Sequence, residues 1–210
     1  MCIRDRHCTC IKQQYFNSTV LASDKQRLFT QLKNLDTEQR NSSTREIDLA
    51  DSLEIARLIN AEDRKVASEV EKKLPRIAQA IDVVKEAFEQ DGRLIYAGAG
   101  TSGRLGILDA AECPPTFGSD PTQVVGLIAG GKEAVFEAQE GAEDYEENGR
   151  QALREIGLRS RDVVCGLAAS GRTPYVHGAL KEAAERDCKT IFVTTVPGKQ
   201  ITLDVDILID

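Results

Sequence analysis

Apolar residues recur at intervals of three or four over residues 66–88, which is the period of an amphipathic helix. The stripe consists of Val66, Val70, Leu74, Ile77, Ile81, Val84 and Phe88. Asp51-Ser52 predicts the cap of a shorter helix that runs to Asn60, and Asp91-Gly92 predicts the end of the long helix. Pro75 lies inside the stripe, so the long helix is expected to kink or split in two there.

After Arg93 the pattern changes to short, continuous apolar runs that alternate with segments of helical character. Such runs are typical of strands in a parallel sheet that is buried on both faces. They occupy residues 94–97, 124–129, 162–168, 190–194 and 205–209, and helices are expected from residue 104, between residues 132 and 156, and over residues 174–185. This order predicts an α/β fold, a three-layer α/β/α sandwich with a five-stranded parallel sheet, preceded by N-terminal helices.

The 210 residues are expected to divide into three parts. Residues 1–34 lack the apolar core of a signal peptide and are interpreted as a poorly ordered or non-native leader. Residues 35–90 form an N-terminal arm with helices, and residues 91–210 form the α/β domain. Without a secretory signal, a reducing, cytoplasmic location is expected.

Charge and hydropathy exclude two classes of partner. The formal net charge is −7, which makes a general attraction to nucleic acid or to an anionic membrane surface unfavourable. No apolar run approaches the ~18 residues that a membrane span needs. A pocket for a small anion remains compatible with this composition, because a few backbone amides can form it.

Two strand-to-helix turns have the chemistry of anion sites. Residues 98–104 and 170–173 each place glycine, hydroxyl groups and an arginine where a helix is expected to begin. Helix starts carry unpaired N–H groups and a partial positive charge, and glycine lets an anion approach the backbone closely. Both turns would lie at the carboxyl edge of the sheet, where ligands bind. The candidate binding residues are Gly100, Thr101, Ser102, Gly103, Arg104, Ser170, Gly171, Arg172 and Thr173.

Two other ligand classes are disfavoured. The first turn matches G-x-G-x-x-G, but the second strand ends Ile128-Ala129-Gly130-Gly131 without the carboxylate that a dinucleotide site needs for the ribose. No C-x-x-C pair occurs, and the only histidines are His7 and His177, so no metal site is expected. A nucleophilic role for Cys113 is disfavoured because no histidine lies near it in sequence, and His177 is interpreted as structural.

Two carboxylates are candidates for acid–base chemistry. Glu112 is expected at the end of the helix that follows the first turn, just before Pro114-Pro115 stop it. On pattern alone, Glu112 is equally an ordinary helix-end carboxylate. Glu143 lies in an acidic run, where pattern alone favours a solvated face.

Five blocks of sequence resemble the N-acetylmuramic acid 6-phosphate etherase family, which has a sugar isomerase (SIS) domain. They occupy residues 98–106, 109–118, 125–131, 140–144 and 168–175, with supporting segments at 37–41 and 58–63. The resemblance runs from about Leu35 to about Pro197. It departs at His177, where the family pattern has an aliphatic residue, and the family continues beyond the position that corresponds to Asp210.

The resemblance implies a function. The family cleaves the D-lactyl ether of N-acetylmuramic acid 6-phosphate to N-acetylglucosamine 6-phosphate and D-lactate, in cell-wall recycling, without metal or cofactor and as a homodimer. The reaction opens the sugar ring, removes the C2 proton, eliminates lactate and adds water. The family's proton-donor glutamate corresponds to Glu112 and its second active-site glutamate to Glu143, and the two turns are expected to hold the 6-phosphate.

Two alternatives use the same fold. A non-catalytic sugar-phosphate-binding regulator would need no acid–base pair, so Glu112 followed by Cys113-Pro114-Pro115 favours the etherase. A sugar-phosphate isomerase would share ring opening and C2 deprotonation but would not expel lactate. Release of D-lactate separates the etherase from both.

Overall fold

The computed structural model describes residues 39–210, so the leader predicted over residues 1–34 lies outside the described residues. Residues 43–210 form one compact unit. Two short 3-10 helices, η2 (Ser42–Thr44) and η3 (Ile47–Leu49), precede the long helix α3 (Ser52–Glu89). The division predicted at residues 34 and 90 stays a prediction, but the sheet core includes side chains of α3.

The segment predicted as two helices is a single helix of 38 residues. Asp51 caps α3 as expected, since its carboxylate accepts the Glu54 N–H at 2.8 Å. Pro75 does not split the helix. Proline removes the hydrogen bond to the carbonyl of Glu71, and both residues are exposed, so water can hydrate that carbonyl. Gly92 ends the segment, where its N–H donates to the Ala87 carbonyl at 2.7 Å.

The five predicted strands form one sheet in the order β2-β1-β3-β4-β5, and every pair is parallel. The chain therefore proceeds from β1 toward one edge and from β3 toward the other, which makes the boundary between β1 and β3 the topological switch point. The strands are β1 (Leu94–Gly98), β2 (Val124–Ile128), β3 (Val163–Leu167), β4 (Lys189–Val193) and β5 (Ile207–Ile209). The fold predicted from the apolar runs is confirmed.

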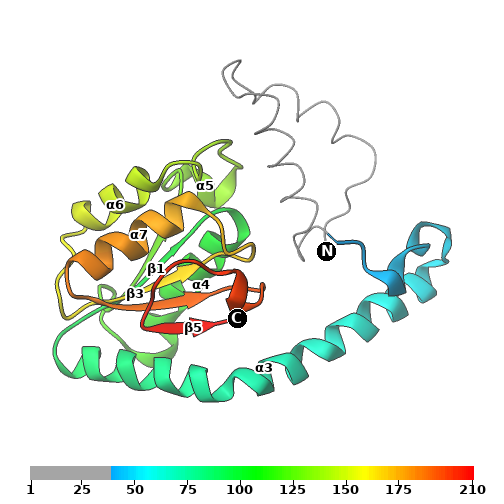
Figure 1. Cartoon of the computed structure of the whole chain (residues 1–210), viewed down its shortest axis with the longest axis horizontal. Helices are drawn as coiled ribbons and strands as arrows, with labels where there is room; N and C mark the ends of the chain where they lie inside the picture. The colour runs from blue at the N-terminus through cyan, green and yellow to red at the C-terminus, as the bar shows by residue number, and fades with distance from the viewer. Residues whose placement is uncertain (1–38) are drawn as a thin grey trace. The chain divides into compact units, whose positions relative to one another are not determined.

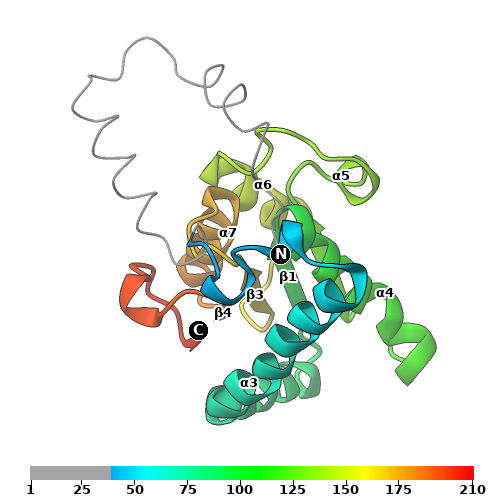
Figure 2. The same cartoon turned by 90° about the vertical axis from the view of Figure 1, so that its right-hand side faces the viewer.

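Helices cover both faces of the sheet, as Figures 1 and 2 show. One face packs against α6 (Glu146–Glu155) and α7 (Pro174–Glu185) around the fully buried Phe192. The other face packs against α3 and α4 (Gly100–Phe117). Two short helices, α5 (Glu133–Phe136) and η4 (Gly198–Gln200), lie in the connections.

Helix α4 differs from its prediction at both ends. It begins at Gly100 rather than Arg104, and it continues through Pro114 and Pro115 to Phe117, so Glu112 is not its last residue. The prolines are tolerated because each removes only one hydrogen bond to the preceding turn. The helix ends where Gly118 takes a left-handed φ of 67° and donates its N–H to the Pro114 carbonyl at 2.8 Å.

Glycines bring α4 into direct contact with β1 and β2. A Cβ added to Gly103 would lie 2.6 Å from Ile128 Cγ1, and one added to Gly106 would lie 2.7 Å from Tyr96 Cβ. On the strand side, a Cβ at Gly126 would lie 2.8 Å from the Cα of Ile107. Helix and sheet backbones therefore approach more closely than side chains normally permit, and this contact sets the direction of α4.

A buried carboxylate joins the starts of β1 and β3. Asp162 is 1% exposed and forms an ion pair with Arg93 at 2.6 Å and with Arg159 at 3.1 Å. It also accepts the backbone N–H groups of both arginines, at 3.0 Å and 2.9 Å. Burial alone would raise the pKa of Asp162, but these hydrogen bonds outweigh it and hold the pKa below its ordinary value.

Replacement of Asp162 by Ala is expected to destabilise the fold by about 3–5 kcal/mol, because it leaves Arg93 largely buried and unpaired. Urea unfolding measures the loss, and exposed Asp82→Ala on α3 is the control, with a change within about 0.5 kcal/mol. The folded pKa lies below the unfolded value of about 3.9, so this stabilisation is present above about pH 4 and is lost as the pH falls through the folded pKa. Equal unfolding midpoints for the two variants would contradict this role.

Candidate functional site

The two predicted anion turns begin side by side. Gly98 at the end of β1 is paired with Leu167 at the end of β3, and neighbouring strands lie about 4.8 Å apart. Both turns follow directly, so they meet at the carboxyl edge of the sheet and at its switch point. In a doubly wound sheet this is where ligands bind.

The first turn is the N-terminal turn of α4. Ala99 takes the N-cap position without a side-chain cap, and the N–H of Gly103 donates to the Ala99 carbonyl at 3.1 Å. The N–H groups that precede Gly103 have no partner within the helix, because the first turn of a helix leaves its donors unpaired. Gly100 and Thr101 are exposed and Ser102 is partly exposed, so this turn presents amides and hydroxyls to a ligand.

Arg104 has a contact that the sequence did not predict. Its Nε donates to the Val135 carbonyl at 2.8 Å and so ties α4 to the end of α5. The Nε of Arg104 therefore holds the connection after β2. The two terminal nitrogens of the guanidinium carry further N–H donors that can face a ligand.

The second turn is held in one conformation by several contacts. Gly171 has a left-handed φ of 67°, and an added Cβ would overlap Ile201 Cδ1, so no other residue fits there without displacement. Its N–H donates to the Ala168 carbonyl at 3.0 Å. The Arg172 N–H faces Ser170 Oγ at 3.3 Å, so an amide and a hydroxyl lie together on this turn.

The start of α7 is less open to an anion than its sequence suggests. Thr173 is the N-cap and Pro174 the first residue, as predicted, but the Thr173 hydroxyl makes no capping bond. Proline has no N–H, and the Tyr175 N–H donates to the Glu143 carbonyl at 3.0 Å. The groups available on this side are therefore the turn amide at Arg172 and the hydroxyls of Ser170 and Thr173.

That same bond places Glu143 beside the second turn. Glu143 lies in the connection between α5 and α6, and its carbonyl is fixed to the first turn of α7. The residue as a whole is exposed, yet partial desolvation of its carboxyl raises its pKa, and the charges of Asp144 and Glu140 raise it further. A carboxyl with a raised pKa is suited to proton transfer near neutral pH.

Glu112 does not join the other site residues within one chain. It lies 12 residues beyond Gly100 on α4, which corresponds to about 18 Å along the helix axis. It is exposed, on the same face of α4 as Leu105 and Leu108, which are each 58% exposed. The structure thus brings the two turns and Glu143 together and leaves Glu112 on the outer surface.

Thr194 and Thr195 support the second turn and were missed in the sequence. Both hydroxyls donate to the Ala169 carbonyl, at 3.1 Å and 2.9 Å, and the Thr195 N–H does so at 3.2 Å. The available signal was their position, since two hydroxyl residues directly follow a buried strand that neighbours β3. His177 also contacts this turn, through the Gly171 carbonyl.

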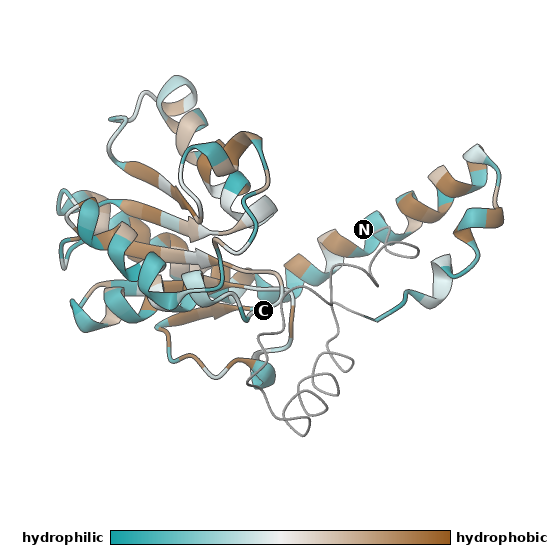
Figure 3. Cartoon of the chain, turned by 90° about the horizontal axis from the view of Figure 1, so that it is seen from above, coloured by the Kyte–Doolittle hydropathy of each residue, from teal (hydrophilic) through white to brown (hydrophobic). Residues whose placement is uncertain are grey.

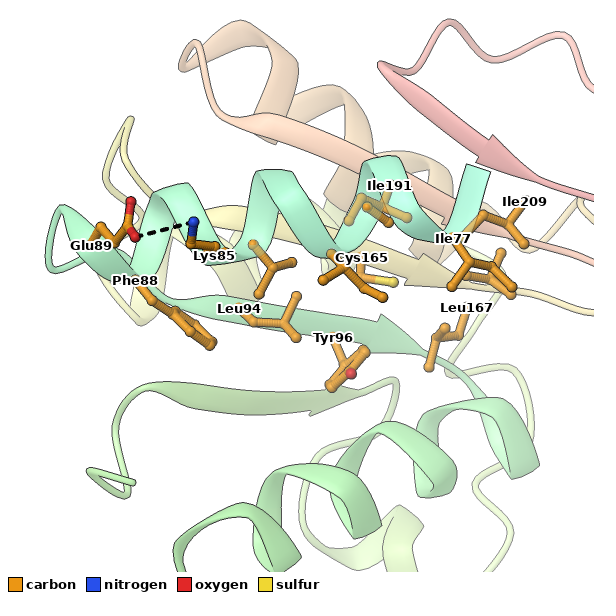
Figure 4. Close-up of a pocket in the computed structure, with 14 residues that line it drawn as sticks. Ile77, Lys85, Phe88, Glu89, Leu94, Tyr96, Cys165, Leu167, Ile191 and Ile209 are labelled. Carbon is orange, nitrogen blue, oxygen red and sulfur yellow. Dashed lines mark ion pairs between the residues drawn. The ribbon is translucent and has the colours of Figure 1, made fainter. Parts of the chain in front are cut away.

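An apolar groove lies away from these residues. A groove of about 680 Å³ runs between α3 and the sheet, lined by apolar residues that include Tyr96, Cys165 and Leu167 (Figure 4). Its main charged feature is the ion pair of Lys85 with Glu89, 3.5 Å apart. None of the predicted site residues lines it, so it is not the anion site.

The described residues also bear on metal and membrane binding. Over residues 39–210, no group of three or more His, Cys, Asp or Glu side chains is arranged to hold a metal ion. No helix in that part of the chain is long and apolar enough to cross a membrane.

The sheet order and the paired turns at its switch point define a doubly wound α/β domain with a candidate anion site at its carboxyl edge. The family model of the glucokinase regulatory protein N-terminal SIS domain matches residues 76–184. The chain belongs to this SIS-domain family.

Curated relatives agree with the resemblance found in the sequence. An N-acetylmuramic acid 6-phosphate etherase of Salinibacter ruber is 56% identical over 187 residues, which cover 89% of this chain and 60% of that protein. An enzyme of the same name from Clostridium beijerinckii is 55% identical over 163 residues, 78% of this chain and 54% of that protein. The chain therefore spans about three fifths of the length of such relatives.

Solved structures show the same fold. A phosphoheptose isomerase from Neisseria gonorrhoeae superposes with a TM-score of 0.58 at 22% identity, covering 74% of this chain and 82% of that chain. Another, from Francisella tularensis, gives 0.55 at 19% identity, covering 77% and 87%. At this identity the likeness concerns the fold alone.

Proposed function

We propose that this chain carries the catalytic core of a lyase that cleaves the D-lactyl ether of N-acetylmuramic acid 6-phosphate, giving N-acetylglucosamine 6-phosphate and D-lactate in cell-wall recycling. The main support is the identity of 56% to an enzyme of that name across the residues that form both turns. The site agrees with this chemistry, since it offers amides and hydroxyls for a phosphate and a carboxyl with a raised pKa beside them.

The first turn and the second turn would hold the 6-phosphate and so fix the sugar carbons relative to the carboxylates. Orientation of this kind contributes several kcal/mol to catalysis. The C2 proton, acidified by the C1 aldehyde of the opened ring, needs a base, and the departing lactate oxygen needs an acid. Glu143 and Glu112 supply two carboxyls in different environments, which is how acid and base roles are divided in other enzymes.

The decisive experiment is an assay of D-lactate released from N-acetylmuramic acid 6-phosphate. It compares this chain with a version extended to the full length of the Salinibacter ruber protein, whose matched part is 60% of its length. Release by the extended version supports the lyase. Sugar phosphate that binds to both versions without release of lactate would favour the second candidate, a non-catalytic regulator, because the matching family model is named for a regulatory protein.

We also propose that the protein acts as a homodimer. The exposed apolar stripe of α3, with Val66, Val70, Leu74 and Ile81 at 46–62% exposure, is visible along the helix in Figure 3. An amphipathic helix gains most of its stability from packing of its apolar face, so such a stripe favours a partner. A second copy can bury the same surface on both chains at once.

The outer face of α4 would belong to this dimer, because Leu105 and Leu108 are exposed there next to Glu112. A dimer that buries this face would deliver Glu112 to the turns of the partner chain, which its distance of about 18 Å from its own first turn prevents within one chain.

Replacement of Leu108 by Glu is expected to convert the dimer to monomers at micromolar concentration, because it places a charge in a desolvated interface. Sedimentation velocity measures the change. Gln151→Glu, on α6 over the opposite face of the sheet, should leave the dimer intact. A dimer that survives Leu108→Glu would place the interface elsewhere.

A cytoplasmic location is proposed as well. Cys113, Cys165 and Cys188 are free thiols in the described part of the chain, which agrees with a reducing compartment.

Replacement of Asp144 by Asn is expected to lower the pKa of Glu143, because it removes a neighbouring negative charge. The limb of the kcat/KM profile that Glu143 governs should therefore move to lower pH. The limb moves to lower pH in either case, whether Glu143 must be ionised to act as a base or protonated to act as an acid. The control Asp63→Asn, exposed on α3, should not move the limb, and a limb unmoved by Asp144→Asn would exclude Glu143 as its source.

A further inference from the structure

His177 connects the second turn to the buried core. It lies in the first turns of α7, and its ring nitrogen Nε2 is 2.8 Å from the carbonyl oxygen of Gly171. A carbonyl can only accept, so Nε2 carries the hydrogen of this bond. The ring meets Phe192 edge-to-face, with centroids 6.1 Å apart and an interplanar angle of 86°, and Phe192 is fully buried in β4. The orientation of the imidazole is therefore set by the core.

The bond to His177 fixes a whole peptide unit of the turn. In a trans peptide the carbonyl and the following N–H point in opposite directions, and no described residue has a cis bond. The Gly171 carbonyl is directed to His177, so the Arg172 N–H must point away from α7. On that side it meets Ser170 Oγ at 3.3 Å, which is a long bond that a stronger acceptor can replace or share.

Without the imidazole this peptide would have fewer restraints. Gly171 has no Cβ, and glycine reaches alternative backbone conformations more readily than other residues. The backbone of His177 reinforces the link, since its N–H donates to the Thr173 carbonyl at 3.1 Å. One residue thus contacts both Gly171 and Thr173, the middle and the end of the turn.

We propose that His177 is a positioning residue for anion binding: it holds the Gly171–Arg172 peptide so that the Arg172 N–H and Ser170 Oγ are preorganised for a phosphate oxygen. The inference rests on the proposed sugar-phosphate site and deepens it, because it assigns His177 a role that neither resemblance nor relatives provide. The His177 ring contacts the Gly171 carbonyl and Phe192, so its expected effect is on affinity rather than on the chemical step.

The test measures binding of N-acetylglucosamine 6-phosphate by calorimetry for the unmodified chain and for four variants, two of which change His177. His177→Leu, which carries an aliphatic side chain of the kind in the family pattern, removes the donor and should weaken binding about five- to tenfold. His177→Gln retains an N–H that can reach the Gly171 carbonyl and should restore affinity to within about threefold. A tenfold change equals about 1.4 kcal/mol, in the range of one neutral hydrogen bond.

Lys181→Leu is the matched control. Lys181 lies one turn further along α7, and its ammonium pairs with Glu146 at 2.7 Å without contacting the turn. It should bind the sugar phosphate as the unmodified chain does. Thermal melts of all variants confirm that each is folded, and kcat in the lactate assay should be unchanged while KM rises in His177→Leu alone.

Three results would overturn the inference. Equal affinity of His177→Leu and the unmodified chain would show that the peptide needs no such restraint, while weakened binding by Ser170→Ala would leave the proposed function intact. If His177→Gln did not restore affinity, the weaker binding of His177→Leu would be due to lost packing against Phe192 rather than to the lost hydrogen bond. Failure of the unmodified chain to bind the sugar phosphate would remove the proposed site itself, and the positioning role with it.

Discussion

Replacement of Glu112 by Gln is expected to lower D-lactate release about 10³-fold, because the amide keeps the shape of the side chain but cannot donate or accept the proton. Binding of N-acetylglucosamine 6-phosphate should change little, since the two turns, and not Glu112, are assigned to the phosphate. Stopped D-lactate assays and calorimetry measure the two properties on the same preparation.

Glu133→Gln on α5 is the control for this prediction, as an exposed glutamate of a neighbouring helix. It should retain normal release. Turnover of Glu112→Gln at the rate of the unmodified protein would reject the proton-donor assignment. Loss of sugar-phosphate binding instead would make Glu112 a ligand contact rather than an acid.

Mixing two inactive variants is expected to restore activity if the site is shared between copies. In an equal mixture of Glu112→Gln and Glu143→Gln, half of the dimers contain one copy of each. In such a dimer, one site receives an intact Glu143 from one chain and an intact Glu112 from the other. About a quarter of the sites, and about a quarter of the activity, should therefore return.

This prediction has the largest change in signal, from almost none to a readily measured rate. It follows from the exposed position of Glu112 beside Leu108 and from the fixed position of Glu143 beside α7. The mixture is incubated under conditions that allow exchange of subunits, which labelled chains verify. If exchange occurs and the mixture stays inactive, both glutamates act within one chain, and α4 must then change its conformation to bring them together.

Local signals in the sequence were sufficient for the sheet and for α7. Thr173, Pro174 and the apolar period that follows predicted residues 174–185, the bounds observed for α7. Prolines misled the prediction of α4 and α3, because their cost depends on whether the carbonyls they leave unpaired can reach water. That exposure is a property of the tertiary structure and does not appear in the local pattern.

The candidate site was only partly accessible to the same reasoning. The two turns were evident from glycine, hydroxyl and strand patterns, and the parallel sheet placed them at one edge. The position of Glu143 depends on a backbone bond to Tyr175, 32 residues further along the chain, and its acidic neighbours indicated only a solvated face. Its role came from the resemblance alone and stays a prediction, as do the other assigned roles.

The glycine contacts at the base of α4 have a mechanical consequence. Any tilt of the helix is about the close contact of Gly103 and Gly106 with the sheet. A tilt of about 5° there would displace Glu112, which lies about 9–14 Å further along the helix, by roughly 1 Å, and a misplacement of about 1 Å can cost a reaction a factor of about 100. The tilt caused by a methyl group added at either glycine would therefore produce its largest displacement at the far end of the helix. The position of Glu112 thus depends on two glycines that lie several turns away from it.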